Sequence, residues 1–153
     1  MMIPPFNPGD SKSRSIDARL ESTQAFPKHL SQIVSHLRAV ERDNSLTAYV
    51  GAMCVGGGSI LSLAVNHSRL NVYCALRAPG YPNGTHAEVA AIFQVRKKVD
   101  LSGTKMFVAR VKRNGEIAMA QPCRMCRELI RSYGIKRVFF TIDENTYGVW
   151  KPS

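Results

Sequence analysis

Apolar residues recur along the chain with two different periods, one typical of helices and one of strands. The first helical pattern lies between residues 27 and 42. Pro27 suits the first turn of a helix, where a backbone N–H is not needed. We therefore expect an amphipathic helix over these residues. Its apolar face consists of Leu30, Ile33, Val34, Leu37 and Val40.

Shorter apolar segments bounded by turn residues predict β-strands. Gly56-Gly57-Gly58 separates the first two segments, which we expect to pair as a hairpin. Asn114-Gly115 marks another turn, because this dipeptide tolerates positive φ. The last two segments flank Asp143-Glu144-Asn145, and we expect them to run antiparallel. The expected strands span residues 48–55, 59–65, 105–111, 117–120, 135–142 and 146–150.

Two further helices are expected, with a loop rich in Asn, Pro and Gly over residues 66–84 before the first of them. Thr85 is a suitable N-cap for this helix. Pro122 opens the second helix, and Gly134 suits the position just past its end. Helices that alternate with strands predict an α/β fold with a sheet covered by helices. The apolar positions of the first of these helices are Val89, Ile92, Phe93 and Val99.

Length and composition indicate a single globular domain. The chain has 153 residues, of which 44% are hydrophobic, and this suits one core. Residues 1–25 differ from the rest, because they combine prolines, serines and scattered charges with few apolar residues. We expect a flexible basic arm over residues 1–25 and the folded domain over residues 26–153.

We expect a cytoplasmic protein with no membrane partner. The best candidate for a membrane span, residues 48–65, is interrupted by three glycines. The first residues lack the basic start and apolar run of a signal peptide. The net charge of +10 favours anionic partners, such as nucleotides or nucleic acid, although it can also serve solubility alone.

Two short motifs carry the candidate chemistry, His86-Ala87-Glu88 and Pro122-Cys123-Arg124-Met125-Cys126. Together they supply one imidazole, two thiols and one carboxylate. A zinc ion held by three protein ligands keeps an open position at which it activates water. We expect His86, Cys123 and Cys126 to hold one zinc ion in a hydrolytic enzyme.

Both motifs fall in the first turn of an expected helix. Residues three apart share one helix face, so Cys123 and Cys126 can reach the same metal. The partial positive charge of a helix N-terminus favours thiolate over thiol. Glu88 follows the histidine by two residues, and we assign it as a proton shuttle and not as a ligand.

Two other interpretations of the cysteine motif stay open. One is a redox dithiol, with His86 as an ordinary surface residue. The other is a closed structural zinc site, whose fourth ligand would be Cys54, Cys74, His67 or another histidine. Cys54 lies in an expected buried strand, which favours core packing. Cys74 lies in the expected loop and remains a candidate ligand.

The motif pair resembles the cytidine deaminase-like superfamily of zinc-dependent nucleotide and nucleic-acid deaminases, over roughly residues 28–150. The resemblance implies a single-domain, three-layer α/β/α fold with a mixed central sheet of about five strands. It implies that zinc-bound hydroxide attacks C4 of a cytosine while Glu88 shuttles protons. It further implies that the Ala87 backbone lines the base pocket and that Asn66 contacts the sugar or base, although Asn66 also suits a turn.

The expected substrate is a cytosine (deoxy)nucleotide or nucleoside, which becomes the uracil form as ammonia leaves. His86 as a ligand is similar to deoxycytidylate deaminases, whereas free cytidine deaminases have cysteine there. Arg69, in the loop before the helix of the first motif, is a candidate phosphate contact or else a solvated loop arginine. Since oligomers are common in the superfamily, we expect a homo-oligomer.

Two alternative functions remain at this point. One is a deaminase of cytosine or adenine in single-stranded DNA, RNA or transfer RNA. Its basic face would consist of Arg124, Arg127 and Arg131, and its stacking residues would be Tyr73, Tyr81, Tyr147 and Trp150, although packing explains each aromatic at least as well. The other alternative is a non-catalytic binding module stabilised by zinc.

Overall fold

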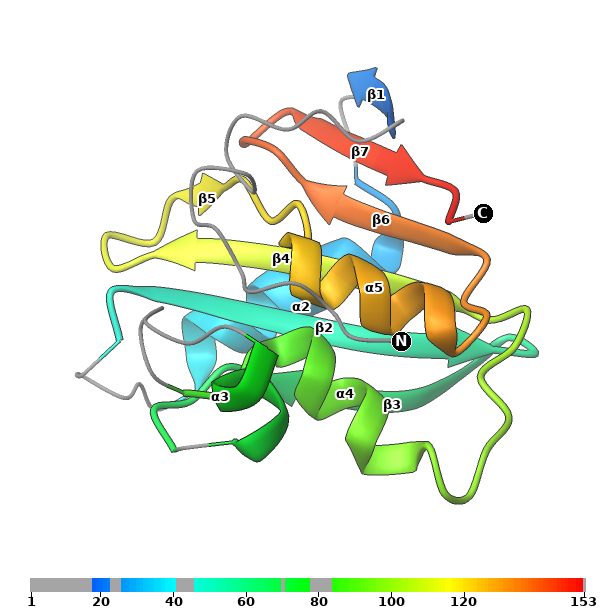
Figure 1. The fold of residues 1–153 in the computed structure, drawn as a ribbon. Helices are drawn as coiled ribbons and strands as arrows, with labels where there is room; N and C mark the ends of the chain where they lie inside the picture. Colours follow the sequence, from blue (N-terminus) through cyan, green and yellow to red (C-terminus); the bar gives the residue numbers. More distant parts are fainter. Residues whose placement is uncertain (1–17, 23–25, 41–45, 70, 78–83, 153) are drawn as a thin grey trace.

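Within the described residues, a mixed sheet is covered by helices on both faces, which gives three layers (Figure 1). This confirms the predicted fold class. The computed structural model describes residues 18–22, 26–40, 46–69, 71–77 and 84–152. The strands are β1 (Ala18–Ser22), β2 (Ala48–Gly56), β3 (Ser59–Val65), β4 (Lys105–Lys112), β5 (Ile117–Ala118), β6 (Arg137–Thr141) and β7 (Thr146–Trp150). The helices are α2 (Lys28–Ala39), α3 (Val72–Arg77), α4 (Ala87–Val95) and α5 (Arg124–Ser132).

The strand order is β1-β7-β6-β4-β2-β3, and the short β5 pairs with β4. Strands β4 and β6 run parallel, so their connection crosses over the sheet through α5. The other neighbours pair antiparallel, including β6 with β7, as predicted. The described residues hold seven strands, whereas the family resemblance implied about five. The difference arises because β1 extends one edge of the sheet and the two-residue β5 pairs with β4.

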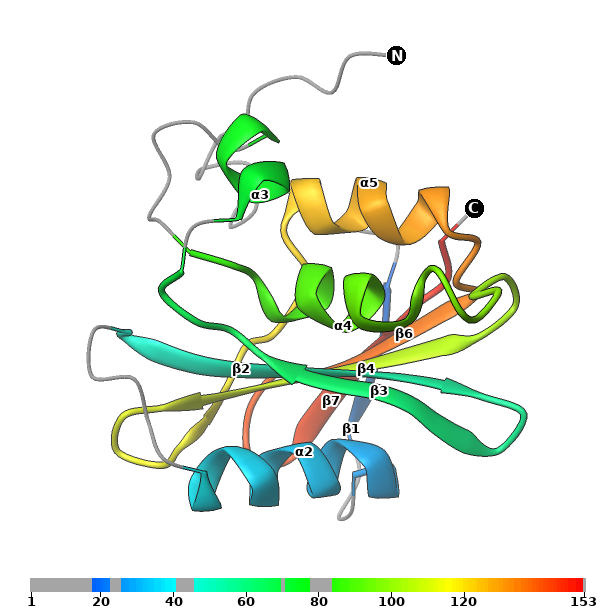
Figure 2. The same cartoon turned by 90° about the horizontal axis from the view of Figure 1, so that it is seen from below.

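Two apolar cores lie on opposite faces of the sheet. Helix α2 covers one face, and α4 and α5 cover the other (Figure 2). Side chains alternate along a strand, so β4 contributes to both cores. Phe107, Ala109 and Val111 pack on the α2 side, whereas Met106 and Val108 pack under α4 and α5. The face under α4 and α5 is the one on which the candidate site forms.

The arm expected over residues 1–25 is partly ordered. Its residues 18–22 form strand β1, which pairs antiparallel with β7. This corrects the expectation of a flexible segment there, because the backbone of these residues completes the edge of the sheet. Residues 1–17 and 23–25 lie outside the described residues. The division of the chain at residue 25 stays a prediction.

The segment predicted as a loop over residues 66–84 contains a helix, α3, which the prediction missed. Its first turn is helped by Asn71, whose side-chain oxygen accepts a hydrogen bond from the Cys74 N–H at 3.1 Å. Of the residues that follow, 78–83 lie outside the described part. None of the described helices is both long enough and apolar enough to cross a membrane.

The predicted role of Thr85 as a helix cap is wrong. Its backbone pairs with His67, so the helix begins later and His86 takes the N-cap position without a side-chain capping bond. The Thr85 hydroxyl instead donates to the Arg69 carbonyl at 3.1 Å. Helix α4 ends at Val95, short of Val99. By contrast, Gly134 has a φ of 73° just past α5, as predicted for a helix C-terminus.

The contact between β6 and β7 has one tight point. Gly148 lies opposite Phe140, whose buried ring covers it. A methyl group on Gly148 would overlap three atoms of that ring. We expect Gly148→Ala to lower the free energy of unfolding by about 1–3 kcal/mol through overpacking, measured by urea denaturation. In a Phe140→Leu background the same substitution should cost less, and an equal cost would show that the ring is not responsible.

Candidate metal centre and active-site pocket

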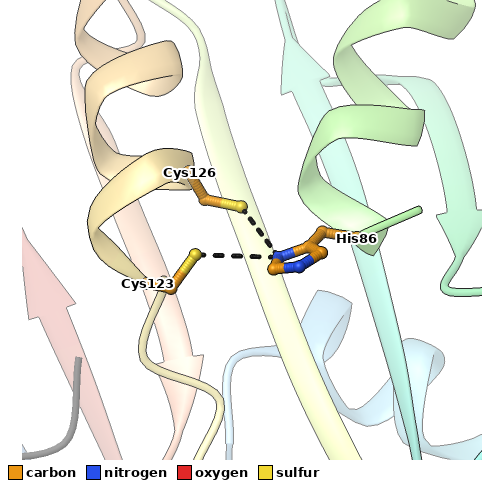
Figure 3. Close-up of side chains that lie close together, drawn as sticks. All are labelled: His86, Cys123 and Cys126. Carbon is orange, nitrogen blue, oxygen red and sulfur yellow. Dashed lines mark hydrogen bonds between the residues drawn. The ribbon is translucent and has the colours of Figure 1, made fainter. Parts of the chain in front are cut away.

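Three potential metal ligands converge where two helices begin. His86 is the N-cap of α4, Cys123 is the N-cap of α5, and Cys126 lies in the first turn of α5. Figure 3 shows both thiols directed at the same imidazole nitrogen. The His86 Nδ1 lies 3.6 Å from the Cys123 Sγ and 3.5 Å from the Cys126 Sγ. The ligand atoms of the three residues lie within 4.8 Å of one another.

The packing of α4 and α5 side by side on the sheet brings these residues together. Both helices bury apolar side chains against the same face, and their first turns lie at the same end (Figure 1). The start of α5 is further fixed by Arg127, which is buried and donates from Nη1 to the Pro122 carbonyl at 2.9 Å. This bond holds the segment just before Cys123 against its own helix.

Glu88 lies beside the cluster and is shielded from water, with 6% of its surface exposed. Burial disfavours the carboxylate and raises the pKa of Glu88 to about 6, although the nearby His86 acts in the opposite direction. The side chain also hydrogen-bonds to Cys126. A carboxyl group shielded from water beside three potential metal ligands is suited to carry a proton.

The two thiols affect each other's ionisation. A hydrogen bond from Cys126 lowers the pKa of Cys123 well below that of a free thiol, and His86 lowers it further. The same hydrogen bond, together with burial, raises the pKa of Cys126. Burial lowers the pKa of His86, but the contact with Cys123 outweighs this and the pKa is raised. Such a cluster is held together by protons that a metal ion can replace.

The donor set fits one Zn²⁺. Two thiolates and one imidazole match the ligands of catalytic zinc sites, which keep a fourth position open. Among the described residues no other histidine or cysteine joins the cluster. Cys54 packs in the core, as predicted, and Cys74 is buried in α3, where its thiol hydrogen-bonds to the His86 backbone. The geometry therefore favours an open site over a closed structural one.

A pocket of about 560 Å³ opens beside the cluster. Its lining includes Ala48 and Val50 of β2, Asn66 just after β3, and Arg110 of β4. Residues 84–88, 119–121 and Cys123 also line it. The volume is in the range of small-molecule sites. Glu88 lines the pocket together with His86 and Cys123, two of the potential metal ligands, so a bound molecule there would contact the candidate chemistry directly.

Two of the residues predicted to contact substrate, Ala87 and Asn66, line this pocket. The Asn66 side chain also continues the strand pairing. Its Oδ1 accepts from the Val50 N–H at 2.9 Å, and its Nδ2 donates to the Ala48 carbonyl at 3.1 Å. Two hydrogen bonds to β2 therefore hold the Asn66 side chain where it lines the pocket. The alternative prediction of a turn residue is wrong.

Arg69 is not brought to the pocket. It is exposed, and it is absent from the described residues that line the cavity. The backbone carbonyl of Arg69 accepts a hydrogen bond from the Thr85 hydroxyl. Sequence reasoning missed Arg110, which does line the pocket. The signal was present in β4, where Met106, Val108 and Arg110 share one face and only Arg110 is charged.

We expect the purified protein to bind one zinc ion per chain, and Cys126→Ser to reduce that content strongly, because it removes one of three ligands. Metal content after dialysis, measured by plasma mass spectrometry, checks this. Cys54→Ala is the matched control and should keep its zinc, since Cys54 lies in the core outside the cluster. Full zinc retention by Cys126→Ser would contradict the assigned ligand set.

Similar folds occur among solved structures. The chain matches the apo dCMP deaminase of cyanophage S-TIM5 with a TM-score of 0.51 and 21% identity, over 78% of this chain and 87% of that one. The same phage enzyme in complex with dCMP and dUMP gives 0.47 and 23%, over 74% and 75%. A cytidine deaminase mutant from Mycobacterium tuberculosis gives 0.49 and 18%, over 84% and 92%. The match to the apo phage enzyme shows a shared fold.

The comparison with curated proteins gives no match. A family model does match, and its description is the cytidine and deoxycytidylate deaminase zinc-binding region. The match covers residues 27–142, which include both motifs and most of the sheet. The predicted resemblance is thereby confirmed at the level of the family. This chain belongs to the family of zinc-binding cytidine and deoxycytidylate deaminases.

Proposed function

We propose that the protein is a zinc-dependent hydrolytic deaminase that converts a cytosine (deoxy)nucleotide or nucleoside to its uracil form and releases ammonia. One observation carries the proposal, which is the presence of a buried carboxyl group, Glu88, beside a histidine–dithiol cluster in one pocket. Family membership supports the reaction class.

In this proposal His86, Cys123 and Cys126 hold the zinc ion. A bound zinc ion supplies a Lewis acid that makes a water molecule reactive at neutral pH. Glu88 would take one proton from the attacking water and give it to the ring nitrogen. It would then carry the second proton, from the hydroxyl left on the attacked carbon, to the departing amine, so that ammonia leaves and a carbonyl remains. Its position supports this role, because it lines the pocket two residues after His86 and is screened from bulk water.

The rest of the pocket positions the substrate. We assign the base to the wall formed by the Ala87 backbone, and the sugar or base edge to Asn66, whose amide is fixed by β2. The role of Arg69 as a phosphate contact stays a prediction. We further propose a homo-oligomer, for which the described edge strands β1 and β3 are available, and a cytoplasmic location, where free thiols persist.

The nucleic-acid alternative has less support. Of the predicted basic face, Arg127 is buried and bonds to the Pro122 carbonyl, and Arg131 lies over the Trp150 ring. The proposed stacking residues are also engaged in packing. Trp150 is buried, Tyr73 contacts Phe93 and Tyr147 contacts Phe26, whereas Tyr81 lies outside the described residues. Arg127, Arg131, Tyr73, Tyr147 and Trp150 are therefore engaged in contacts within the fold, which leaves the nucleic-acid alternative with less support.

We expect the zinc-loaded protein to release ammonia from at least one of dCMP, CMP, deoxycytidine and cytidine. Glu88→Gln should lower kcat/KM by about 100- to 10,000-fold, because the proton carrier is lost, while zinc content stays unchanged. Glu116→Gln is the matched control, since Glu116 is exposed and outside the pocket. Adenosine, single-stranded DNA and RNA complete the panel.

Several outcomes would contradict the proposal. Full activity of Glu88→Gln would remove Glu88 from the reaction. Ammonia released only from a polynucleotide would move the substrate to nucleic acid. No release from any cytosine compound by a protein that holds its zinc would favour the non-catalytic binding module.

A further inference from the structure

Arg110 occupies a position that the strand pattern assigns to the core. On the α4 and α5 face of β4 it follows Met106 and Val108, both fully buried. It pairs with Val50 on one side and with Ala118 on the other, both apolar. Arg110 is half-buried and lines the pocket. A polar atom that is buried among apolar neighbours needs a hydrogen-bond partner.

Within the described residues Arg110 lacks that partner. Its Nε is buried and makes no hydrogen bond. Among the described residues that line the pocket, the carboxyl group is that of Glu88, and no ion pair joins it to Arg110. The pocket thus contains a cationic side chain that no described acidic residue neutralises.

A second polar atom of the pocket is in the same condition. The Nδ1 of His67 is buried without a hydrogen bond. His67 follows Asn66, and the Asn66 N–H donates to the Val50 carbonyl. Val50 of β2 in turn pairs with Arg110 of β4, so Asn66, Val50 and Arg110 lie side by side across the sheet. His67 and Arg110 therefore approach the pocket from opposite sides of β2. Buried polar atoms without partners are uncommon in folded proteins and need an explanation.

We propose that Arg110, assisted by His67, binds the 5′-phosphate of a mononucleotide and so determines substrate specificity. The guanidinium presents paired N–H donors that match phosphate oxygens, and it stays charged at any physiological pH. The two nitrogens without hydrogen bonds, Arg110 Nε and His67 Nδ1, belong to residues that line the same pocket, where a phosphate could accept hydrogen bonds from them. This inference rests on the proposed function for the rest of the substrate, and it makes dCMP or CMP the preferred substrate over the nucleoside.

Binding of the reaction product tests the inference without turnover. Calorimetry on the zinc-loaded protein compares dUMP with deoxyuridine. We expect the wild type to bind dUMP about 10- to 100-fold more tightly than deoxyuridine, because deoxyuridine lacks the phosphate that would form charge-assisted hydrogen bonds with Arg110. Arg110→Gln should remove most of this preference, and Arg110→Lys, which keeps the charge, should retain part of it.

Lys112→Gln is the matched control. It lies two residues along the same strand and removes the same charge, but Lys112 is exposed, pairs with Glu116 and does not line the pocket. Its preference for dUMP should equal that of the wild type. A loss of preference in Lys112→Gln as large as in Arg110→Gln would reduce the effect to net charge and overturn the inference.

Other outcomes are equally decisive. Equal affinities of the wild type for dUMP and deoxyuridine would overturn the inference whether or not any variant folds. Tighter binding of a uracil-containing single-stranded oligonucleotide than of dUMP would overturn the commitment to a mononucleotide. The protein could show a preference for dUMP that depends on Arg110 and yet have no deaminase activity. That result would support the phosphate site and contradict the proposed function.

Discussion

The candidate site depends on one packing constraint, which is that two helices on the same face of the sheet begin at the same point. His86 precedes α4 and Cys123 precedes α5, so neither ligand is placed by its own helix alone. Their separation is set by the apolar side chains that hold α4 and α5 on β2, β4 and β6. The buried Arg127 adds a local restraint at Pro122. The chemistry of the site is therefore a consequence of the core beneath it.

A single strand or helix contributes residues both to the apolar core and to the pocket. Along β4, two buried apolar residues lead to Arg110, and along α4 the buried Ala87 is followed by Glu88. A charged group at a core position is costly unless something compensates it. The interaction of Glu88 with Cys126 offsets part of the cost of burying its carboxyl group. By contrast, Arg110 Nε and His67 Nδ1 are buried without hydrogen bonds. We assign Glu88 to the reaction, and Arg110 and His67 to recognition of the substrate.

Sequence patterns predicted the elements that bury an apolar face, namely α2, the β2–β3 hairpin and the strands β4, β6 and β7. The motifs at His86 and Cys123 were predictable because both lie at helix starts. By contrast, β1 depends on pairing with β7, far away in sequence, and few apolar residues marked it. The alternation of residues in β4 marks Arg110 as a charged side chain on an apolar face, but only the strand register shows that Arg110, and not Arg69, lies at the pocket.

The proposed chemistry depends on an open zinc site with two sulfur ligands and one nitrogen ligand from the protein. X-ray absorption at the zinc edge of the purified protein measures this coordination. We expect two sulfur atoms at about 2.3 Å and two lighter atoms at about 2.0–2.2 Å, one of them from His86 and one from solvent. A third sulfur in the coordination shell would show that Cys74 closes the site. That result would contradict the assignment of an open, catalytic position.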